Sequence, residues 1–152
     1  MGMIIFLSAQ SQERHCEGKC DGFSCVANCS GTESMVLASG FEATAWASGE
    51  LSNSECQGIF CRSRCLTGIE SCTSQCTGEI CKSMCTGEKC YSKCSGNGCE
   101  TKCEGNNCTA MCYGEDCISS CLGLSCISKC SGANCFMQND TLRSKQTNKI
   151  AN

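Results

Sequence analysis

A cysteine motif that repeats every nine residues runs through most of this 152-residue chain. Between Cys72 and Cys135 the motif Cys-x-x-x-Cys-x-Gly-x-x occurs in seven consecutive copies without insertion or deletion. A short, strict period is typical of a small structural unit stacked on copies of itself, in which each unit contacts only its neighbours. The pattern therefore predicts a solenoid, and it constrains the architecture far more than it constrains the function.

The cysteine-free interval between Cys29 and Cys56 keeps the same period. It is 27 residues long, which equals three periods, and its glycines remain in phase with those of the motif. Small residues occupy the cysteine positions of this interval: Ser34, Ala38, Ala43, Ala47 and Ser52. Because only alanine and serine replace cysteine there, we expect these side chains to point into a tight interior.

The spacing within each repeat indicates an extended chain rather than a helix. Residues two apart in a strand share a face, so Cys72, Ser74 and Cys76 would all point inward. In a helix, successive cysteine pairs would lie on opposite sides, and each glycine would cost about 1 kcal/mol. Glycine instead suits a turn, where it can adopt a positive φ. We predict an all-β, irregular repeat protein, a narrow disulfide-stapled β-solenoid with nine-residue coils.

The chain divides into three segments. Residues 16–135 are predicted to form about thirteen coils, with the cysteine-free coils at 34–52 and a two-residue insertion in the segment 66–71. Residues 1–15 include a short apolar stretch without a basic start, which we interpret as a truncated signal peptide or a cap on the first coil. Residues 136–152 are polar, lack the repeat, and are expected to be a disordered tail.

Composition limits the class of protein. Leu, Ile, Val and Phe are too scarce for an ordinary core, and 22 cysteines take their place. So many cysteines indicate an oxidising compartment, so we expect a secreted, extracellular protein. The net charge of −3 and the scattered basic residues give no support for nucleic-acid binding, and no segment is long enough to span a membrane. We expect no cofactor.

Two pairing schemes fit the cysteine spacing. A bridge within one strand, such as Cys72 to Cys76, would have to span about 13 Å, well beyond the ~7 Å limit for a disulfide. Bridges that close the glycine turns avoid this problem and leave Cys16 and Cys29 unpaired or irregularly bridged. The predicted bridges are Cys20–Cys25, Cys56–Cys61, Cys65–Cys72, Cys76–Cys81, Cys85–Cys90, Cys94–Cys99, Cys103–Cys108, Cys112–Cys117, Cys121–Cys126 and Cys130–Cys135.

The repeated motif Cys-x-Gly-x-x-Cys resembles, in architecture, the disulfide-stapled antifreeze proteins of insects, above all the midge type with its Cys-x-Gly-x-Tyr-Cys repeat. The resemblance implies tight coils, each bisected by a disulfide, and a stacked tyrosine ladder that binds the ice surface. This chain has a period of nine rather than ten, and residues as different as Glu42, Phe60 and Gly98 occupy the tyrosine column. A partial row of hydroxyls after the second cysteine, including Ser39, Thr77 and Ser95, keeps ice binding as the alternative function.

Two further functions compete with a structural role. A metal-thiolate protein is the second alternative, although we predict no metal site because Cys-x-x-Cys pairs are absent and the alternating spacing fits disulfides better. Enzymatic activity is not expected, because His15 is the only histidine and no catalytic constellation can be assembled around it.

The outward side chains of the cysteine-free coils are the most distinctive surface in the sequence. We predict a patch for an unknown protein or surface partner that consists of Met35, Leu37, Phe41, Trp46 and Leu51. Asn139, in the sequence Asn-Asp-Thr, is the best candidate for glycosylation. The sequence as a whole predicts a secreted, non-enzymatic rod with a structural or interaction role.

Overall fold

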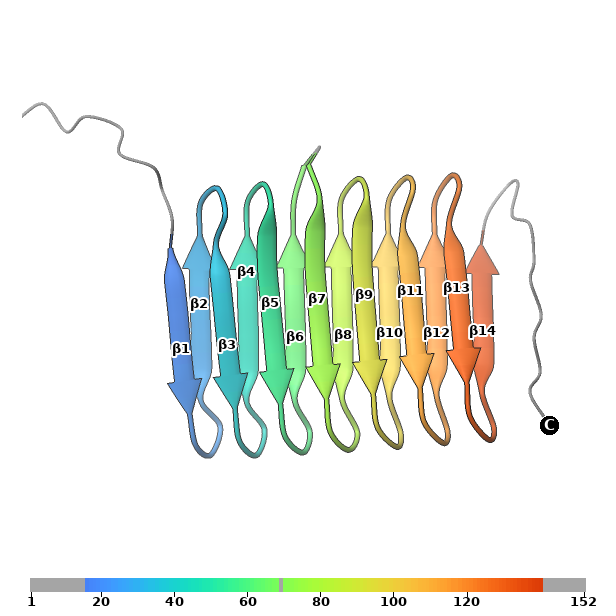
Figure 1. The fold of residues 1–152 in the computed structure, drawn as a ribbon, viewed down its shortest axis with the longest axis horizontal. Helices are drawn as coiled ribbons and strands as arrows, with labels where there is room; N and C mark the ends of the chain where they lie inside the picture. The colour runs from blue at the N-terminus through green and yellow to red at the C-terminus, as the bar shows by residue number, and fades with distance from the viewer. Residues whose placement is uncertain (1–15, 69, 141–152) are drawn as a thin grey trace, which may run out of the picture.

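The computed structural model describes residues 16–68 and 70–140 and forms, within these ranges, a two-sheet β-solenoid of fourteen strands. The odd-numbered strands form one seven-stranded sheet and the even-numbered strands the other (Figure 1). The strands lie across the long axis of the molecule, with β1 and β14 at opposite ends (Figure 1). No helix occurs in the described ranges.

The odd sheet contains β1 (Glu17–Asp21), β3 (Met35–Ser39), β5 (Ser52–Gln57), β7 (Cys72–Thr77), β9 (Cys90–Ser95), β11 (Thr109–Tyr113) and β13 (Ile127–Ser131). The even sheet contains β2 (Val26–Ser30), β4 (Thr44–Ser48), β6 (Arg62–Leu66), β8 (Lys82–Thr86), β10 (Glu100–Glu104), β12 (Ile118–Leu122) and β14 (Phe136–Asp140).

One complete coil contains two nine-residue repeats. Every strand pairs in parallel with the strand two further along the chain, so that Glu100 lies beside Ile118, a separation of 18 residues. The prediction of about thirteen nine-residue coils is therefore wrong in its count, and seven strands in each sheet give about seven coils. The reason is that each repeat supplies one strand and one reversal, and the chain needs two reversals to return to its starting direction.

The alternation within each strand places cysteines and small residues inside, as predicted. In β7, Cys72, Ser74 and Cys76 are 0–1% exposed, whereas Thr73 and Gln75 between them reach the surface. Val36 is the largest fully buried side chain in the described ranges. The space between the two sheets is thus too narrow for the large aliphatic side chains of an ordinary core.

Serine hydroxyls form a buried hydrogen-bonded chain along the solenoid axis. The inward serines of consecutive strands belong to opposite sheets and meet between them, with Oγ–Oγ distances of 2.8–3.0 Å. This chain comprises Ser54, Ser63, Ser74, Ser83 and Ser92. Because each hydroxyl has a partner, these buried polar groups avoid the cost of an unsatisfied hydrogen-bonding group.

The turns need glycine for two reasons. Gly96 has a φ of 139°, which L-residues rarely adopt, and a Cβ built on it would lie 1.9 Å from the carbonyl oxygen of Gly78 in the preceding coil. The residue two positions after most of these glycines also has a left-handed backbone conformation, as in Ile80 with a φ of 52°. Backbone hydrogen bonds such as Gly96 N–H to Tyr113 O, at 2.8 Å, join each turn to the next coil.

The two-residue insertion falls between β6 and β7 and leaves the stacking intact. Arg62 pairs with Lys82, a separation of 20 residues instead of 18, and the strands on either side keep their register. Cys65 and Cys72 remain bridged across the insertion, with a Cα–Cα distance of 6.0 Å. The extra residues are therefore accommodated in the turn, outside the two sheets.

The solenoid continues beyond the predicted end of the array. Residues 136–140 form β14, which pairs with β12 and places the backbone of Asn139 beside Cys121. This strand corrects the expectation that the disordered tail begins at residue 136. The predicted N-terminal segment 1–15 and the rest of the predicted tail, 141–152, lie outside the described residues.

Replacing Gly96 with alanine should destabilise the protein by roughly 2–4 kcal/mol, because both the φ and the close carbonyl oppose a Cβ. Gly68→Ala is the matched control, since a Cβ there meets nothing within 4 Å. Chemical denaturation of the two variants measures the difference. Equal stability of both would contradict the close packing of the turns.

Replacing Ser83 with alanine should cost about 1–3 kcal/mol, because it removes the hydrogen bonds of Ser83 to Ser74 and leaves the buried Ser92 hydroxyl without its acceptor. Alanine fits this inward column, since Ala110 occupies it without exposure. The outward Ser120→Ala is the control, with an expected change within about 0.5 kcal/mol. Thermal unfolding compares the two, and a neutral Ser83→Ala would argue against a stabilising hydroxyl chain.

Candidate functional site

The turns of the solenoid form two edges, and cysteines line both. The first edge consists of the turns that follow odd-numbered strands, and the second edge of those that follow even-numbered strands; they are the lower and upper edges in Figure 1. A bridge at either edge joins the end of a strand in one sheet to the start of the next strand, which belongs to the other sheet. Each disulfide therefore fastens the two sheets together.

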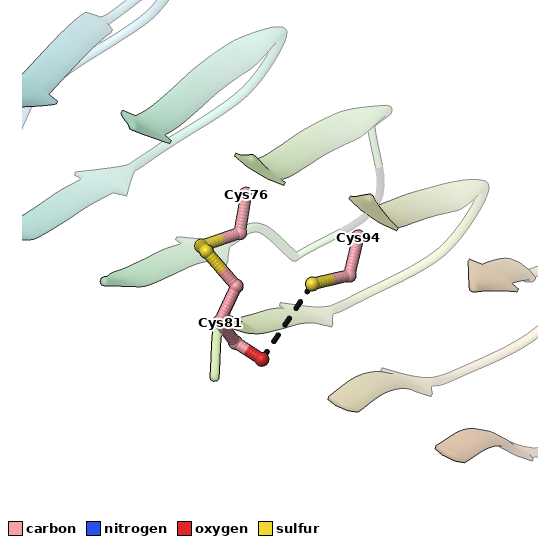
Figure 2. Close-up of side chains that lie close together, drawn as sticks. All are labelled: Cys76, Cys81 and Cys94. Atoms are coloured by element: carbon pink, nitrogen blue, oxygen red, sulfur yellow. Dashed lines mark hydrogen bonds between the residues drawn. A yellow bond between two sulfur atoms is a disulfide. The ribbon is translucent and has the colours of Figure 1, made fainter. Parts of the chain in front are cut away.

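Figure 2 shows one such bridge at the first edge, between Cys76 and Cys81. The Sγ of Cys94, one coil further on, lies 3.5 Å from the carbonyl oxygen of Cys81 (Figure 2). Cys94 is itself bridged to Cys99, so its sulfur has no proton to donate and this is a close sulfur–oxygen contact. The sulfurs are thus packed against the backbone of the neighbouring coil.

Nine disulfides and four free thiols account for the 22 cysteines, all of which lie in the described ranges. Eight of the ten turn-closing bridges expected from the sequence are formed: Cys20–Cys25, Cys56–Cys61, Cys65–Cys72, Cys76–Cys81, Cys94–Cys99, Cys112–Cys117, Cys121–Cys126 and Cys130–Cys135. The expected bridges Cys85–Cys90 and Cys103–Cys108 are not formed, and these four cysteines are free and buried.

Cys16 and Cys29, expected to be unpaired or irregularly bridged, form an irregular bridge with each other. The regular partner of Cys29 would be the first inward residue of the next repeat, but that residue is Ser34. Cys16 holds the equivalent position one coil earlier, since Glu17 pairs with Met35 in the sheet. Cys29 therefore bridges backward, across a Cα–Cα distance of 5.7 Å.

The four free cysteines lie together at the second edge, in two consecutive coils. Cys85 and Cys103 are neighbours in the even sheet, at the ends of β8 and β10. Cys90 begins β9, and Cys108 immediately precedes β11. The sulfurs of Cys85, Cys90 and Cys103 are all within 4.8 Å of one another. We call Cys85, Cys90, Cys103 and Cys108 the thiol cluster.

Hydrogen bonds within the thiol cluster shift the pKa values of its members in opposite directions. Bonds from Cys103, Cys108 and Cys85 lower the pKa of Cys90 far below its usual range, despite burial. The pKa of Cys103 is raised by its hydrogen bonds with Cys108, Cys85 and Cys90, and also by its burial. Cys90 is thus the favoured thiolate, and Cys103 holds its proton most firmly.

Backbone groups complete the surroundings of the cluster. The bond of Cys108 with Cys103 lowers its pKa, but a bond with Cys90 and burial outweigh this effect and raise the pKa of Cys108 to about 11. The backbone N–H groups of Tyr91 and Cys90 contact the sulfurs of Cys85 and Cys108, respectively, and favour their ionised forms. Every sulfur of the cluster therefore has polar partners inside the protein.

Three groups of cysteines have sulfurs close enough to share a metal ion. Two of the groups contain a formed bridge, Cys76–Cys81 in one and Cys130–Cys135 in the other. A bridged sulfur carries no thiolate charge and is a poor metal ligand. Among the described residues, only the group of Cys85, Cys90 and Cys103 consists entirely of free thiols.

The predicted partner patch is not a single surface. Met35 and Leu37 lie on the odd sheet and Trp46 on the even sheet, because consecutive strands belong to different sheets. Phe41 lies at the first edge and Leu51 at the second. The five side chains surround one coil of the rod instead of facing one partner.

An aromatic column that the sequence reading missed lies at the first edge. Phe23 and Phe41 stack with ring centroids 5.3 Å apart, and Phe60 meets Phe41 edge-on at 5.4 Å. All three side chains are substantially exposed, from 39% to 74%. The signal that could have found this column is the 18-residue spacing of Phe23 and Phe41, which equals one complete coil.

Comparison of the chain with protein-family models, with curated proteins and with solved structures finds no match. The resemblance to insect antifreeze proteins is accordingly one of architecture, a β-solenoid with many disulfides. Among residues 16–68 and 70–140, a helix of the length and apolarity needed to cross a membrane does not occur. The cysteine chemistry is therefore the most specific feature from which a function can be argued.

Peptide mapping of the oxidised protein, unfolded in denaturant with a chelator but without reductant, should find four alkylated cysteines: Cys85, Cys90, Cys103 and Cys108. Cys16 and Cys29 should remain linked in one non-reduced peptide pair. Alkylation after full reduction should label all 22 cysteines and provides the reference count. Alkylated Cys16 and Cys29, or an unmodified thiol cluster, would contradict the pairing described above.

Proposed function

We propose that this protein is a secreted, non-enzymatic rod with a structural or interaction role. The observation that carries the proposal is the unbroken pair of in-register parallel sheets, fastened to each other by disulfides along both edges. Such a body is suited to hold a fixed length and to present a repeated surface. No step of the proposed role requires chemistry at a reactive side chain.

The physical basis of rigidity is the coupling of every coil to its neighbours. Backbone hydrogen bonds join both the strands and the turns of successive coils. Each short-loop disulfide contributes roughly 2–3 kcal/mol, mainly by restricting the unfolded chain in a widely used, model-dependent account. The interior also lacks large side chains that could repack, since Val36 is the largest of those fully buried in the described ranges.

Nine disulfides support a location in an oxidising compartment, because such bridges persist outside the cytosol and are reduced within it. The proposed interaction role draws support from the exposed aromatic column of Phe23, Phe41 and Phe60. Beside it, an open hollow of about 290 Å³ is lined by Glu42, Thr44, Phe60 and Arg62. Aromatic side chains and arginine are enriched at protein-contact surfaces.

Ice binding has weaker support than the structural role. The hydroxyl row expected from the sequence divides between the two sheets, with Ser39 and Ser95 on one and Ser48 and Thr86 on the other. The outward columns also mix charged, polar and apolar side chains, as in Glu55, Lys93 and Met111 of the odd sheet. A regular crystal surface calls for a regular row of similar groups, which these columns do not supply.

The rod role is tested by small-angle X-ray scattering and protease resistance, with and without reductant. The oxidised protein should keep the same elongated scattering profile on heating until it unfolds, and reduction should remove its protease resistance. Thermal hysteresis of the oxidised protein should be absent. A reduced chain with unchanged shape and resistance would contradict a disulfide-dependent rod, and strong hysteresis would favour ice binding instead.

A further inference from the structure

The thiol cluster differs from every other part of the cysteine array in the described ranges. Bridges at the same edge flank it on both sides, Cys65–Cys72 in the preceding coil and Cys121–Cys126 in the following one. Two consecutive coils between them hold four free thiols in place of two bridges. The stacking of these coils brings Cys85, Cys90 and Cys103 into one buried group, with Cys108 beside Cys103 and Cys90 (Figure 1 shows the turns, between β8 and β11).

We propose that Cys85, Cys90, Cys103 and Cys108 bind one zinc ion through four thiolate sulfurs. A tetrahedral zinc site with Zn–S bonds of about 2.3 Å has sulfurs roughly 3.8 Å apart. The sulfurs of Cys85, Cys90 and Cys103 already lie within 4.8 Å of one another. Cys108 is not part of this close trio, but its sulfur is hydrogen-bonded to those of Cys103 and Cys90, and a small inward shift would make it the fourth donor.

The chemistry of the donors favours zinc over harder ions. Four thiol sulfurs form a soft donor set, and a tetrahedral arrangement of four sulfurs is typical of zinc or iron–sulfur sites. Closely spaced sulfurs suit a single ion at their centre. Magnesium and calcium prefer oxygen ligands, which the cluster does not offer as side chains.

Metal binding requires ionised sulfurs, so zinc would displace the protons of all four thiols. The N–H groups of Tyr91 and Cys90 contact the sulfurs of Cys85 and Cys108, in the manner of the outer-shell donors that stabilise metal ligands.

The proposal also explains how free thiols and disulfides coexist in one array. Oxidation proceeds through attack by a free thiolate, and a thiolate bound to zinc is held in a coordinate bond. Zinc bound early would therefore protect these two coils while the others form bridges. The site goes beyond the proposed rod function and does not depend on it, because flanking bridges fasten the sheets in either case.

The first test is native mass spectrometry of the purified protein, followed by metal exchange. We expect one zinc ion per chain, and removal by a chelator under anaerobic conditions should expose four alkylatable thiols. Cobalt(II), added to the metal-free protein as a spectroscopic probe, should give thiolate charge-transfer bands and the visible bands of tetrahedral coordination. One equivalent of cobalt(II) should saturate these bands, and added zinc should displace the cobalt and abolish them.

Two variants separate ligation from folding. Cys103→Ser should weaken cobalt binding by more than the roughly 10–100-fold that loss of an outer-shell partner costs. The control is the double variant Cys121→Ser/Cys126→Ser, which removes the adjacent bridge and should bind cobalt as the natural chain does. Small residues are accepted at this edge, since Ser34 and Ser52 are buried at the inward position that corresponds to Cys126, and Ala47 is buried in the column of Cys103 and Cys121.

Three outcomes would overturn the zinc site. In the first, the native protein is four hydrogen atoms lighter than a chain with nine disulfides, because the cluster is oxidised to two further bridges. In the second, the free thiols give no tetrahedral cobalt spectrum. In the third, Cys103→Ser binds cobalt as tightly as the control. Each of these results would leave the rod function to be judged by its own scattering test. The site is supported if the cobalt spectrum saturates at one equivalent in the natural chain and in Cys121→Ser/Cys126→Ser but not in Cys103→Ser.

Discussion

The narrow space between the two sheets is the constraint on which this structure depends. Every inward position must hold a small group, and Val36 is the largest side chain that is fully buried in the described ranges. A gap of this width cannot bury enough apolar surface to stabilise a chain by hydrophobic packing alone. Disulfides at the edges and hydroxyl chains at the centre supply the missing cross-links, as Cys76–Cys81 and Ser74–Ser83 illustrate.

The same constraint gives the turns their character. Neighbouring coils approach so closely that a Cβ on Gly96 would collide with the backbone of Gly78. The turn glycines therefore persist even between Cys29 and Cys56, where the cysteines are absent, and the two-residue insertion before β7 is absorbed in a turn rather than in a strand. Regular stacking in turn fixes the distance between equivalent cysteines of successive coils. This is how two pairs of thiols become a group of four at the second edge.

The features that distinguish one coil of this solenoid from another are departures from the repeat. The repeated parts give length and stiffness, and they look alike from coil to coil. The thiol cluster and the aromatic column of Phe23, Phe41 and Phe60 are both local, and each occupies two or three neighbouring coils. A rod with one buried metal site and one exposed aromatic edge would combine a structural body with two specific points of recognition.

The sequence by itself determined the local structure, because the period of two within a strand and the glycine in each turn are short-range properties. It correctly predicted inward Cys72, Ser74 and Cys76, a positive φ at the turn glycines, and a β-solenoid rich in disulfides. Only the tertiary structure decided how many repeats make a coil, because identical repeats cannot reveal which of their neighbours they pair with. Two repeats per coil place Trp46 and Met35 on opposite sheets, bridge Cys29 backward to Cys16, and bring Cys85 beside Cys103. Those contacts join residues 13 to 18 positions apart, and they follow from the stacking of coils rather than from any property of one repeat.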